Sequence, residues 1–387
     1  MRTSLLRLVV VLACLCLPWA AEGKTRRLAV VVGNNSSQEA GLEALKFADD
    51  DAMQYAWFFR FVADEVWLHV RPDEESAAMH PNEETAGPPT RDAVLATLDA
   101  AVEKAQAWAD AGDEVVVYLL FSGHGSYDAE GKGFLHLEDG KLTTRDLFYH
   151  LIGRTEDFFA VLVIDACNAG FLVKSKGPGR RAAGETTLEI EQYGNVGLVL
   201  ASSPTGEVRE WGRYLAGIFS HQVRSALSGA ADVDADGKVS FQELASFVEA
   251  ANRAVTNPAL KLTPYIRPPL SRPGLPLVDF SDALFTQYLS VQLDHAGKVA
   301  VYDQELVRVA DFHLDAGVAA KVALAGTGEH FVAVDGKEYR VPAGTRGTVA
   351  LGDLAVDEEP QVAVRGVDEY YSKHLFAIPY SPEFARQ

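Results

Sequence analysis

The sequence places one cysteine and one histidine where their side chains could act together in nucleophilic catalysis. Cys167 follows the apolar run 158–164, and small residues flank it. His124 lies between two glycines, just after the largely apolar run 114–121. A thiolate attacks a carbonyl carbon when an imidazole takes its proton and backbone N–H groups stabilise the oxyanion. The competing interpretation is a buried cysteine and a structural histidine, both of which are common in proteins.

Both residues follow predicted β-strands, so the surrounding elements determine whether the two side chains meet. Strands and helices alternate along this part of the chain, which predicts a mainly parallel α/β sheet flanked by helices. Such sheets bind ligands outside the carboxyl ends of their strands. We therefore expect His124 and Cys167 at one edge of the sheet. The predicted strands are 28–32, 66–70, 114–121, 158–164 and 196–202, and the predicted helices are 42–59, 90–109 and 143–152.

The α/β pattern spans residues 26–262, and the composition of the sequence changes after it. Residues 263–280 are rich in proline and are interpreted as a linker. Residues 281–387 predict a small all-β C-terminal domain, an antiparallel sandwich or barrel, because short apolar runs alternate with Gly and Asp turns. The predicted strands there are 289–293, 298–301, 306–310, 318–325, 331–334, 338–341, 348–351 and 361–364.

Two of the three cysteines lie in an N-terminal segment with the pattern of a secretion signal. Residues 1–21 combine a basic start, an apolar run over 8–17 and a small-residue end. Cleavage would export the protein to the periplasm or the exterior and leave Cys167 as its one cysteine, unable to form an internal disulfide. Two alternatives are an uncleaved anchor and a lipoprotein cleaved before Cys14.

The charge balance excludes several classes of partner. The 387 residues contain 35 Lys and Arg against 54 Asp and Glu, a formal net charge of −19. An acidic surface repels phosphate backbones and anionic lipid, so we expect no nucleic-acid partner. No membrane span is expected after signal cleavage, and the oligomeric state remains open. A hydrophobic content of 48% with 23% charged residues excludes a disordered chain.

The two sequence motifs together resemble the catalytic signatures of a known superfamily. A strand followed by Ser-Gly-His-Gly at 122–125 and, about forty residues later, a strand followed by Asp-Ala-Cys at 165–167 resemble those of caspase and metacaspase cysteine endopeptidases. The resemblance covers residues 27–252 and implies a caspase-like fold. It also implies Cys167 as nucleophile, His124 as general acid and base, and the N–H groups of Gly125 and Cys167 as oxyanion donors. Asn168 and Ala169 replace the His-Ser that metacaspases usually carry there, which leaves the shape of the subsites open.

The same resemblance suggests a preference for basic substrates. It implies that Asp165 lines the pocket for the residue before the cleaved bond, and that Asp51 supplies a second carboxylate. Two carboxylates would bind Arg or Lys and reject an acidic side chain. The expected substrates are therefore proteins or peptides cleaved after Arg or Lys. For Asp51 a solvated helix acid is the alternative, and Glu207 and Glu210 are further candidates for the pocket.

Residues 174–184 form a basic island in an acidic protein, directly after the candidate nucleophile. One interpretation is a surface loop. The other, implied by the resemblance to caspase-like enzymes, is a site of self-processing between the two halves of the domain.

Residues 232–243 match the twelve-residue EF-hand calcium loop at each ligand position. Gly237 occupies the sixth position, where the loop turns sharply. A calcium cofactor is therefore expected, with the affinity of extracellular sites, although the chemistry of peptide hydrolysis requires no metal. The alternative is a degenerate loop that caps the following helix without binding metal. The predicted ligands are Asp232, Asp234, Asp236, Lys238 through its carbonyl, Ser240 and Glu243.

Two functions of different class follow. The first is an exported cysteine endopeptidase that cleaves after Arg or Lys through a thioacyl-enzyme intermediate. The second is a catalytically silent caspase-like scaffold that acts as a calcium-dependent interaction module. The presence of Cys167, His124 and Asp165 together favours the enzyme, because a silent scaffold has no need to keep all three.

Overall fold

A six-stranded sheet organises the first two thirds of the chain in the computed structural model, which describes residues 24–173, 190–201, 210–257, 260–357 and 369–387 apart from 38, 40, 81, 82 and 213. The strand order is β12-β8-β7-β3-β1-β2. The pairs within β8-β7-β3-β1-β2 are parallel, and β12 joins β8 antiparallel. The strands are β1 (Thr25–Asn34), β2 (Glu65–His69), β3 (Glu114–Gly123), β7 (Phe159–Ala166), β8 (Val196–Leu200) and β12 (Tyr265–Arg267).

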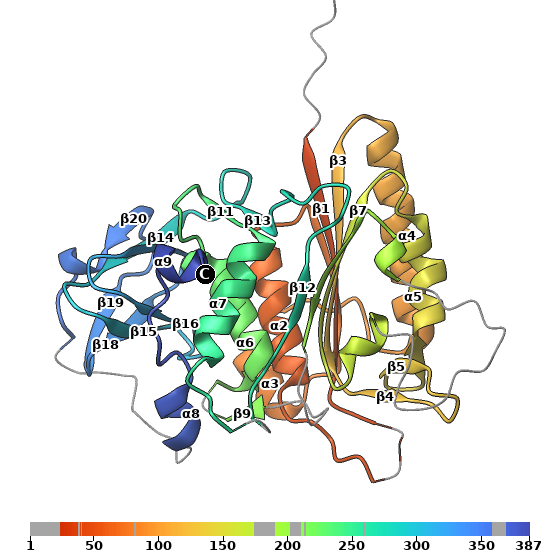
Figure 1. The fold of residues 1–387 in the computed structure, drawn as a ribbon, viewed down its shortest axis with the longest axis horizontal. Helices are drawn as coiled ribbons and strands as arrows, with labels where there is room; N and C mark the ends of the chain where they lie inside the picture. The colour runs from red at the N-terminus through yellow and green to blue at the C-terminus, as the bar shows by residue number, and fades with distance from the viewer. Residues whose placement is uncertain are drawn as a thin grey trace, which may run out of the picture.

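Both faces of the sheet are buried, which explains why its strands read as continuous apolar runs. Side chains alternate along β3: Val117 and Leu119 pack into one hydrophobic cluster, whereas Val116 and Tyr118 pack into another on the opposite face. Helices cover both faces (Figure 1). The first cluster includes α4 (Arg91–Asp110) and α5 (Thr144–His150); the second includes α2 (Ala48–Phe59), α6 (Ile218–Ser225) and α7 (Phe241–Asn252). The predicted α/β architecture is confirmed.

The proline-rich segment differs from the linker predicted for residues 263–280. It contains β12 at the edge of the central sheet and β13 (Val278–Asp279), which pairs with β11 (Lys238–Val239). Proline removes a ladder donor, so such a segment can form only very short edge strands. The segment is therefore part of the α/β structure and does not act as a linker between two domains.

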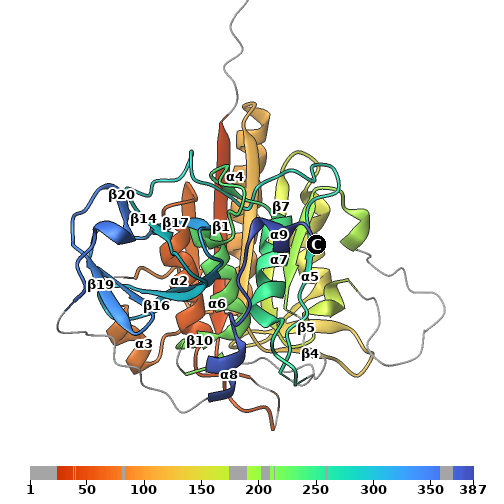
Figure 2. The same cartoon turned by 60° about the vertical axis from the view of Figure 1, so that its left-hand side comes forward.

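The C-terminal region contains two small sheets that pack against the α2, α6 and α7 side of the central sheet (Figures 1 and 2). Two short helices follow the sheets, α8 (Glu369–His374) and α9 (Pro382–Ala385). Seven of the eight predicted strands are present, and residues 361–364 lie outside the described part. One pairing differs from the antiparallel prediction, since β14 and β20 are parallel. The sheets have the orders β17-β14-β20 and β16-β15-β18-β19. The strands are β14 (Gln287–Gln292), β15 (Gly297–Tyr302), β16 (Arg308–Leu314), β17 (Ala319–Leu324), β18 (His330–Val334), β19 (Lys337–Val341) and β20 (Gly347–Ala350).

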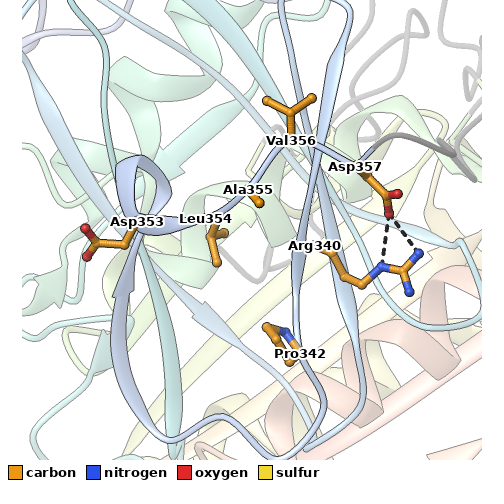
Figure 3. A pocket seen from close by; sticks show the side chains of 7 residues that line it. All are labelled: Arg340, Pro342, Asp353, Leu354, Ala355, Val356 and Asp357. Atoms are coloured by element: carbon orange, nitrogen blue, oxygen red, sulfur yellow. Dashed lines mark hydrogen bonds and ion pairs between the residues drawn. The ribbon is translucent and has the colours of Figure 1, made fainter.

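A shallow pocket of about 640 Å³ lies in this region, between β19 and residues 353–357 (Figure 3). Arg340 and Asp357 form an ion pair at its edge, with Nη2 and Oδ2 2.8 Å apart. The residues lining it include neither Cys167 nor His124, so this pocket is separate from the candidate site.

Candidate active site

The candidate dyad lies at the carboxyl ends of two neighbouring parallel strands. In the register of β3 and β7, Ser122 is opposite Asp165 and Gly123 is opposite Ala166. His124 directly follows Gly123 at the end of β3, and Cys167 directly follows Ala166 at the end of β7. The two residues therefore emerge side by side at one edge of the sheet, as the sequence predicts.

Gly125 packs directly against the backbone of the candidate nucleophile. A Cβ atom at Gly125 would lie 2.2 Å from the carbonyl oxygen of Cys167, so only glycine fits there. The side chain of Asn168 donates from Nδ2 to the carbonyl oxygen of Gly125 over 3.5 Å. Asn168 itself has a φ of 60°, a left-handed conformation that Asn tolerates better than most residues. These contacts hold the turn after β7 against the turn after β3.

His124 is buried and its ring is oriented by a backbone group. Nε2 donates a hydrogen bond of 2.9 Å to the carbonyl oxygen of Glu43. This bond places the ring proton on Nε2 and leaves the lone pair on Nδ1. Burial lowers the pKa of His124. The imidazole is therefore neutral near pH 7 and can accept a proton at Nδ1.

His136 supports His124, although its sequence position gives no sign of this. Its backbone N–H donates to the carbonyl oxygen of His124 over 2.9 Å, and the two ring centroids are 6.0 Å apart. The Nε2 atom of His136 is 2.8 Å from Oγ of Ser126. His136 is buried, so it packs beside the candidate site rather than lying on the surface.

Two buried carboxylates, Asp51 and Asp165, lie close together, and Asp165 is two residues before Cys167 in the chain. We call them the carboxylate pair. A Cβ atom built on Gly217 would lie 2.7 Å from Oδ2 of Asp165 and 2.9 Å from Oδ2 of Asp51. The two acids predicted to share one pocket are thus brought together from α2 and β7.

Asp51 is fully engaged by other groups of the protein. Its Oδ1 accepts from Nη1 of Arg224 over 2.7 Å. Its Oδ2 accepts from the N–H of Gly217 over 2.9 Å and from Oγ of Ser122 over 3.1 Å. The side chain is 1% exposed, which excludes the solvated helix acid that the three consecutive aspartates left open.

Asp165 keeps one oxygen without a partner among the described residues. Oδ2 accepts from the N–H and the Oγ of Ser220, over 3.0 and 2.8 Å. No hydrogen bond to Oδ1 is present within the described ranges. Burial, together with the charge of Asp51, raises the pKa of Asp165 to about 7. Of the pair, Asp165 is the carboxylate with a free acceptor for a cation.

Glu210, a further sequence candidate, lies near the carboxylate pair but binds backbone. Its Oε1 accepts from the N–H groups of Lys46 and Phe47 over 3.1 and 2.8 Å. Burial raises the pKa of Glu210, and the charges of Asp51 and Asp49 add to the effect. Glu207, the loop 174–184 and the signal 1–21 lie outside the described residues.

The sequence reasoning missed the residues that hold the carboxylate pair. Ser220 and Arg224 lie four residues apart on α6 and therefore on one face of that helix. Gly217 is the N-cap residue of the same helix. The i, i+4 spacing of these two polar residues was the available signal, but nothing in the sequence identifies their partners on α2 and β7.

The candidate calcium loop brings its first three acids together. One carboxylate oxygen from each of Asp232, Asp234 and Asp236 lies within 4.8 Å of the others. Oε1 of Glu243 accepts from the N–H of Val233 over 3.1 Å, so this side chain also faces the loop. Its other oxygen caps α7 through Ser240. These hard oxygen donors fit a calcium ion, and the capping contact would have to loosen for Glu243 to give both oxygens.

Strand β11 within this loop pairs with β13 of the proline-rich segment. The two strands form a short antiparallel ladder, and Nζ of Lys238 lies 3.0 Å from Oδ2 of Asp279. The loop is therefore supported from the same chain by a two-residue strand.

Comparison with family models identifies the family of the α/β part of the chain. The family model of the caspase domain matches residues 26–272, well over half of the chain. The chain belongs to the caspase domain family. The caspase-like family predicted from the sequence is confirmed. This family is one of cysteine peptidases, some of whose members are inactive.

The solved structures that resemble parts of this caspase domain protein include the following two. No curated protein matches it. A protein from Geobacter sulfurreducens is 17% identical, over 63% of this chain and 94% of its own, with a TM-score of 0.38. Pro-Sf-caspase-1 is 13% identical, over 64% of this chain and 88% of its own, with a TM-score of 0.39. The family assignment rests on the sequence match alone. Among the described residues, no helix is both long and apolar enough to cross a membrane.

Proposed function

We propose that this caspase domain protein is an exported cysteine endopeptidase that cleaves after Arg or Lys. The observation that carries the proposal is that His124 and Cys167 emerge at adjacent strand ends, with Asp165 of the carboxylate pair two residues before Cys167 on β7. The signal pattern of residues 1–21 supports export.

In the first half of the reaction, Nδ1 of His124 takes the proton from the Cys167 thiol. The thiolate then attacks the scissile carbonyl carbon. The N–H groups of Gly125 and Cys167 donate to the oxyanion that develops. When the intermediate collapses, His124 returns the proton to the leaving amine, and the acyl group stays on sulfur as a thioester.

The second half repeats these roles with water. Neutral His124 takes a proton from a water molecule, which attacks the thioester carbon, and Cys167 leaves as the thiolate before it is reprotonated. The bond to Glu43 orients the ring throughout, because its carbonyl oxygen fixes the tautomer and stabilises the transient imidazolium. This arrangement needs no metal for its proton transfers.

The carboxylate pair supplies the preference for a basic residue. Oδ1 of Asp165 accepts from the guanidinium or ammonium group of the substrate. Asp51 contributes less directly, because Arg224 already neutralises it and all of its hydrogen bonds are internal. An acidic side chain would meet a buried carboxylate without any counter-ion, which is strongly unfavourable.

The proposal predicts that peptides ending in Arg or Lys are cleaved far better than matched peptides ending in Asp. Two fluorogenic tetrapeptides that differ only in this last residue give the measurement, and a citrulline peptide controls for the size of Arg without its charge. We expect at least a hundredfold ratio of kcat/KM for Arg over citrulline, because the charge-assisted bond to Asp165 is lost. Equal or better cleavage after Asp would refute this specificity.

Calcium binding at residues 232–243 is the second part of the proposal. The convergence of Asp232, Asp234 and Asp236 supports it. Burial and the charge of Glu243 raise the pKa of Asp232 to about 6, so the loop carries repulsion that a cation would relieve. An isolated loop of this kind has the weak affinity of extracellular sites, with a Kd on the order of 10⁻⁴–10⁻³ M.

Calcium is expected to stabilise the folded protein through this loop. At ten times Kd the free energy of unfolding should rise by about 1.4 kcal/mol, measured by thermal or urea unfolding. Asp232→Ala, which removes the ligand at the first position of the loop, should abolish the increase. Asp92→Ala, which removes an exposed carboxylate elsewhere, should leave it unchanged. If calcium neither releases heat in calorimetry nor shifts unfolding, the loop is a helix cap only.

A further inference from the structure

Helix α6 contacts the carboxylate pair with one face and the C-terminal region with another. Ser220 donates to Asp165, and Arg224 donates to Asp51. The residue after Ser220 is His221, which points the other way and binds Asp311 of β16. The two sets of contacts come from adjacent residues of one short helix, so a shift of one set must move the other.

Asp311 holds α6 at two points. Its Oδ2 accepts from Nε2 of His221 over 2.7 Å. Its backbone N–H donates to Oγ of Ser225 over 3.0 Å, and this hydroxyl donates to the carbonyl oxygen of His221 over 2.8 Å. Side chain and backbone of one residue therefore fix both turns of the helix to β16.

Asp311 is itself fixed from within the C-terminal region. Nε of Arg308 donates to Oδ2 of Asp311 over 2.5 Å, and Nη2 donates to the other oxygen. The guanidinium also lies over the rings of Tyr214 and Tyr302, with centroid distances of 5.3 and 5.5 Å. A bidentate, stacked arginine leaves the carboxylate little freedom to move.

This network is buried and forms part of a continuous core. Ser220, His221 and Ser225 are 0% exposed, and Asp311 is 5% exposed. Side chains of α6 and β16 belong to the same hydrophobic cluster, and the two elements lie side by side in Figures 1 and 2. Burial lowers the pKa of His221 to about 4, so its ring is neutral and donates one hydrogen bond.

We propose that Asp311 is a positioning residue of the substrate site: through His221 it fixes α6, and α6 in turn fixes the carboxylate pair. The C-terminal region is then a structural part of the site that recognises the basic side chain, not a separate appended module. This inference rests on the proposed function, since it assigns Asp311 to the recognition of that same substrate.

The coupling between Asp311 and Asp165 runs through the backbone of α6 at residues 220 and 221. The backbone N–H of Ser220 donates to Asp165 and directly precedes His221 in the chain. Without the bond to Asp311, the turn at 220–221 can rotate or shift by a fraction of an ångström. Recognition of a cation by Asp165 depends on that geometry, whereas the turns that carry Cys167 and His124 are held by β3 and β7. Loss of the bond should weaken recognition of the basic side chain and leave the reactivity of the thiol intact.

His221→Phe tests the proposal without leaving a charge unpaired. Phe keeps the stacking on Tyr214, where the ring centroids are 3.8 Å apart, and Asp311 keeps its pair with Arg308. We compare two alkylating reagents on Cys167. A peptidyl-arginine chloromethylketone requires the carboxylate pair, whereas iodoacetamide requires only the thiolate.

The expected result is a selective loss. In His221→Phe the second-order rate constant for the arginyl chloromethylketone should fall about tenfold, whereas the rate for iodoacetamide should change less than twofold. His221→Gln, which keeps an N–H donor, should restore most of the arginyl rate. Unchanged arginyl labelling in a folded His221→Phe variant would overturn the proposal, as would an equal loss with both reagents.

A second measurement separates this inference from the proposed function. If the wild type is not labelled by the arginyl reagent at all, the proposed specificity fails. Hydrogen exchange of the amides of residues 217–225 then tests the link by itself. We expect at least tenfold faster exchange in His221→Phe and wild-type protection in His221→Gln. Unchanged protection in both variants would show that Asp311 does not hold α6.

Discussion

Replacing Cys167 with alanine is expected to reduce kcat for an arginyl peptide by about 10⁴-fold or more, because the variant retains substrate binding but has no nucleophile. The residue is half-buried at the end of β7, so removal of one sulfur should leave the folded structure unchanged. The measurement is steady-state hydrolysis of the fluorogenic peptide, with circular dichroism and thermal unfolding as checks of folding.

The matched control for this variant is Gly170→Ala. Gly170 lies three residues after Cys167, and a Cβ atom there would meet no atom within 4 Å. This variant should therefore keep activity within a few-fold of wild type. Activity of Cys167→Ala at more than a few per cent of the wild type would exclude Cys167 as the nucleophile.

Asp165→Asn is expected to lower kcat/KM for arginyl peptides by about a hundredfold or more, because a buried charge pair with the substrate loses its anionic member. Hydrolysis of the citrulline peptide should change much less. The loss thus separates recognition of charge from damage to the dyad. Asp92→Asn, an exposed carboxylate on α4, controls for the change in net charge.

The pKa of Asp165 gives this prediction a pH dependence. Because burial raises that pKa to about 7, the carboxylate is mainly protonated at pH 6 and mainly ionised at pH 8. Binding of an arginyl peptide by the Cys167→Ala variant should therefore strengthen by roughly tenfold between these pH values, measured by calorimetry. The citrulline peptide should show no such change. Pairing with the bound cation lowers the carboxyl pKa, so the increase would be steepest below pH 7.

The raised pKa of Asp165 also affects the free energy of unfolding. Its contribution to stability decreases as pH rises, whereas binding of the basic peptide strengthens. A carboxyl group whose pKa is raised on folding favours the folded state at low pH, and this contribution is lost as pH rises from about 4 through 7. Asp165→Asn, which stays neutral, should therefore be at least as stable as the wild type at pH 8. A strongly destabilised variant, or equal losses for the arginyl and citrulline peptides, would contradict the role given to Asp165.

The sequence was sufficient to place the candidate dyad, because local pattern determines where parallel strands end. The apolar runs before His124 and Cys167 predict two buried strands, and parallel strands bring their carboxyl ends to one edge. The resemblance also singled out Gly125, as a candidate oxyanion donor. Only the structure shows why glycine is needed there: a Cβ atom would collide with the carbonyl oxygen of Cys167.

The partners of the carboxylate pair were not predictable in this way. Arg224 neutralises Asp51 across 173 residues of sequence, and Asp311 binds His221 across 90. Such contacts depend on how α6 packs between the central sheet and β16, which no local pattern encodes. The sequence predicts two carboxylates around one pocket, and in the structure one is fully engaged by protein groups whereas the other keeps an open oxygen.

The proline-rich segment shows a different limit of prediction from sequence. Composition correctly indicates that residues 263–280 contain no long strand or helix. It cannot indicate that three of these residues extend the central sheet through β12 or that two support the candidate calcium loop through β13. Short edge strands gain their stability from the surface they join, so they carry little signal of their own.

Labelling with a peptidyl-arginine chloromethylketone tests the central claim most directly, because it requires the nucleophile and the basic specificity at once. We predict a single adduct on Cys167 by intact-mass and peptide mass spectrometry, formed by displacement of chloride. The reaction should be prevented by Cys167→Ala and much slower in Asp165→Asn. Absence of any adduct with and without calcium, or faster labelling by the matched aspartyl reagent, would contradict the account.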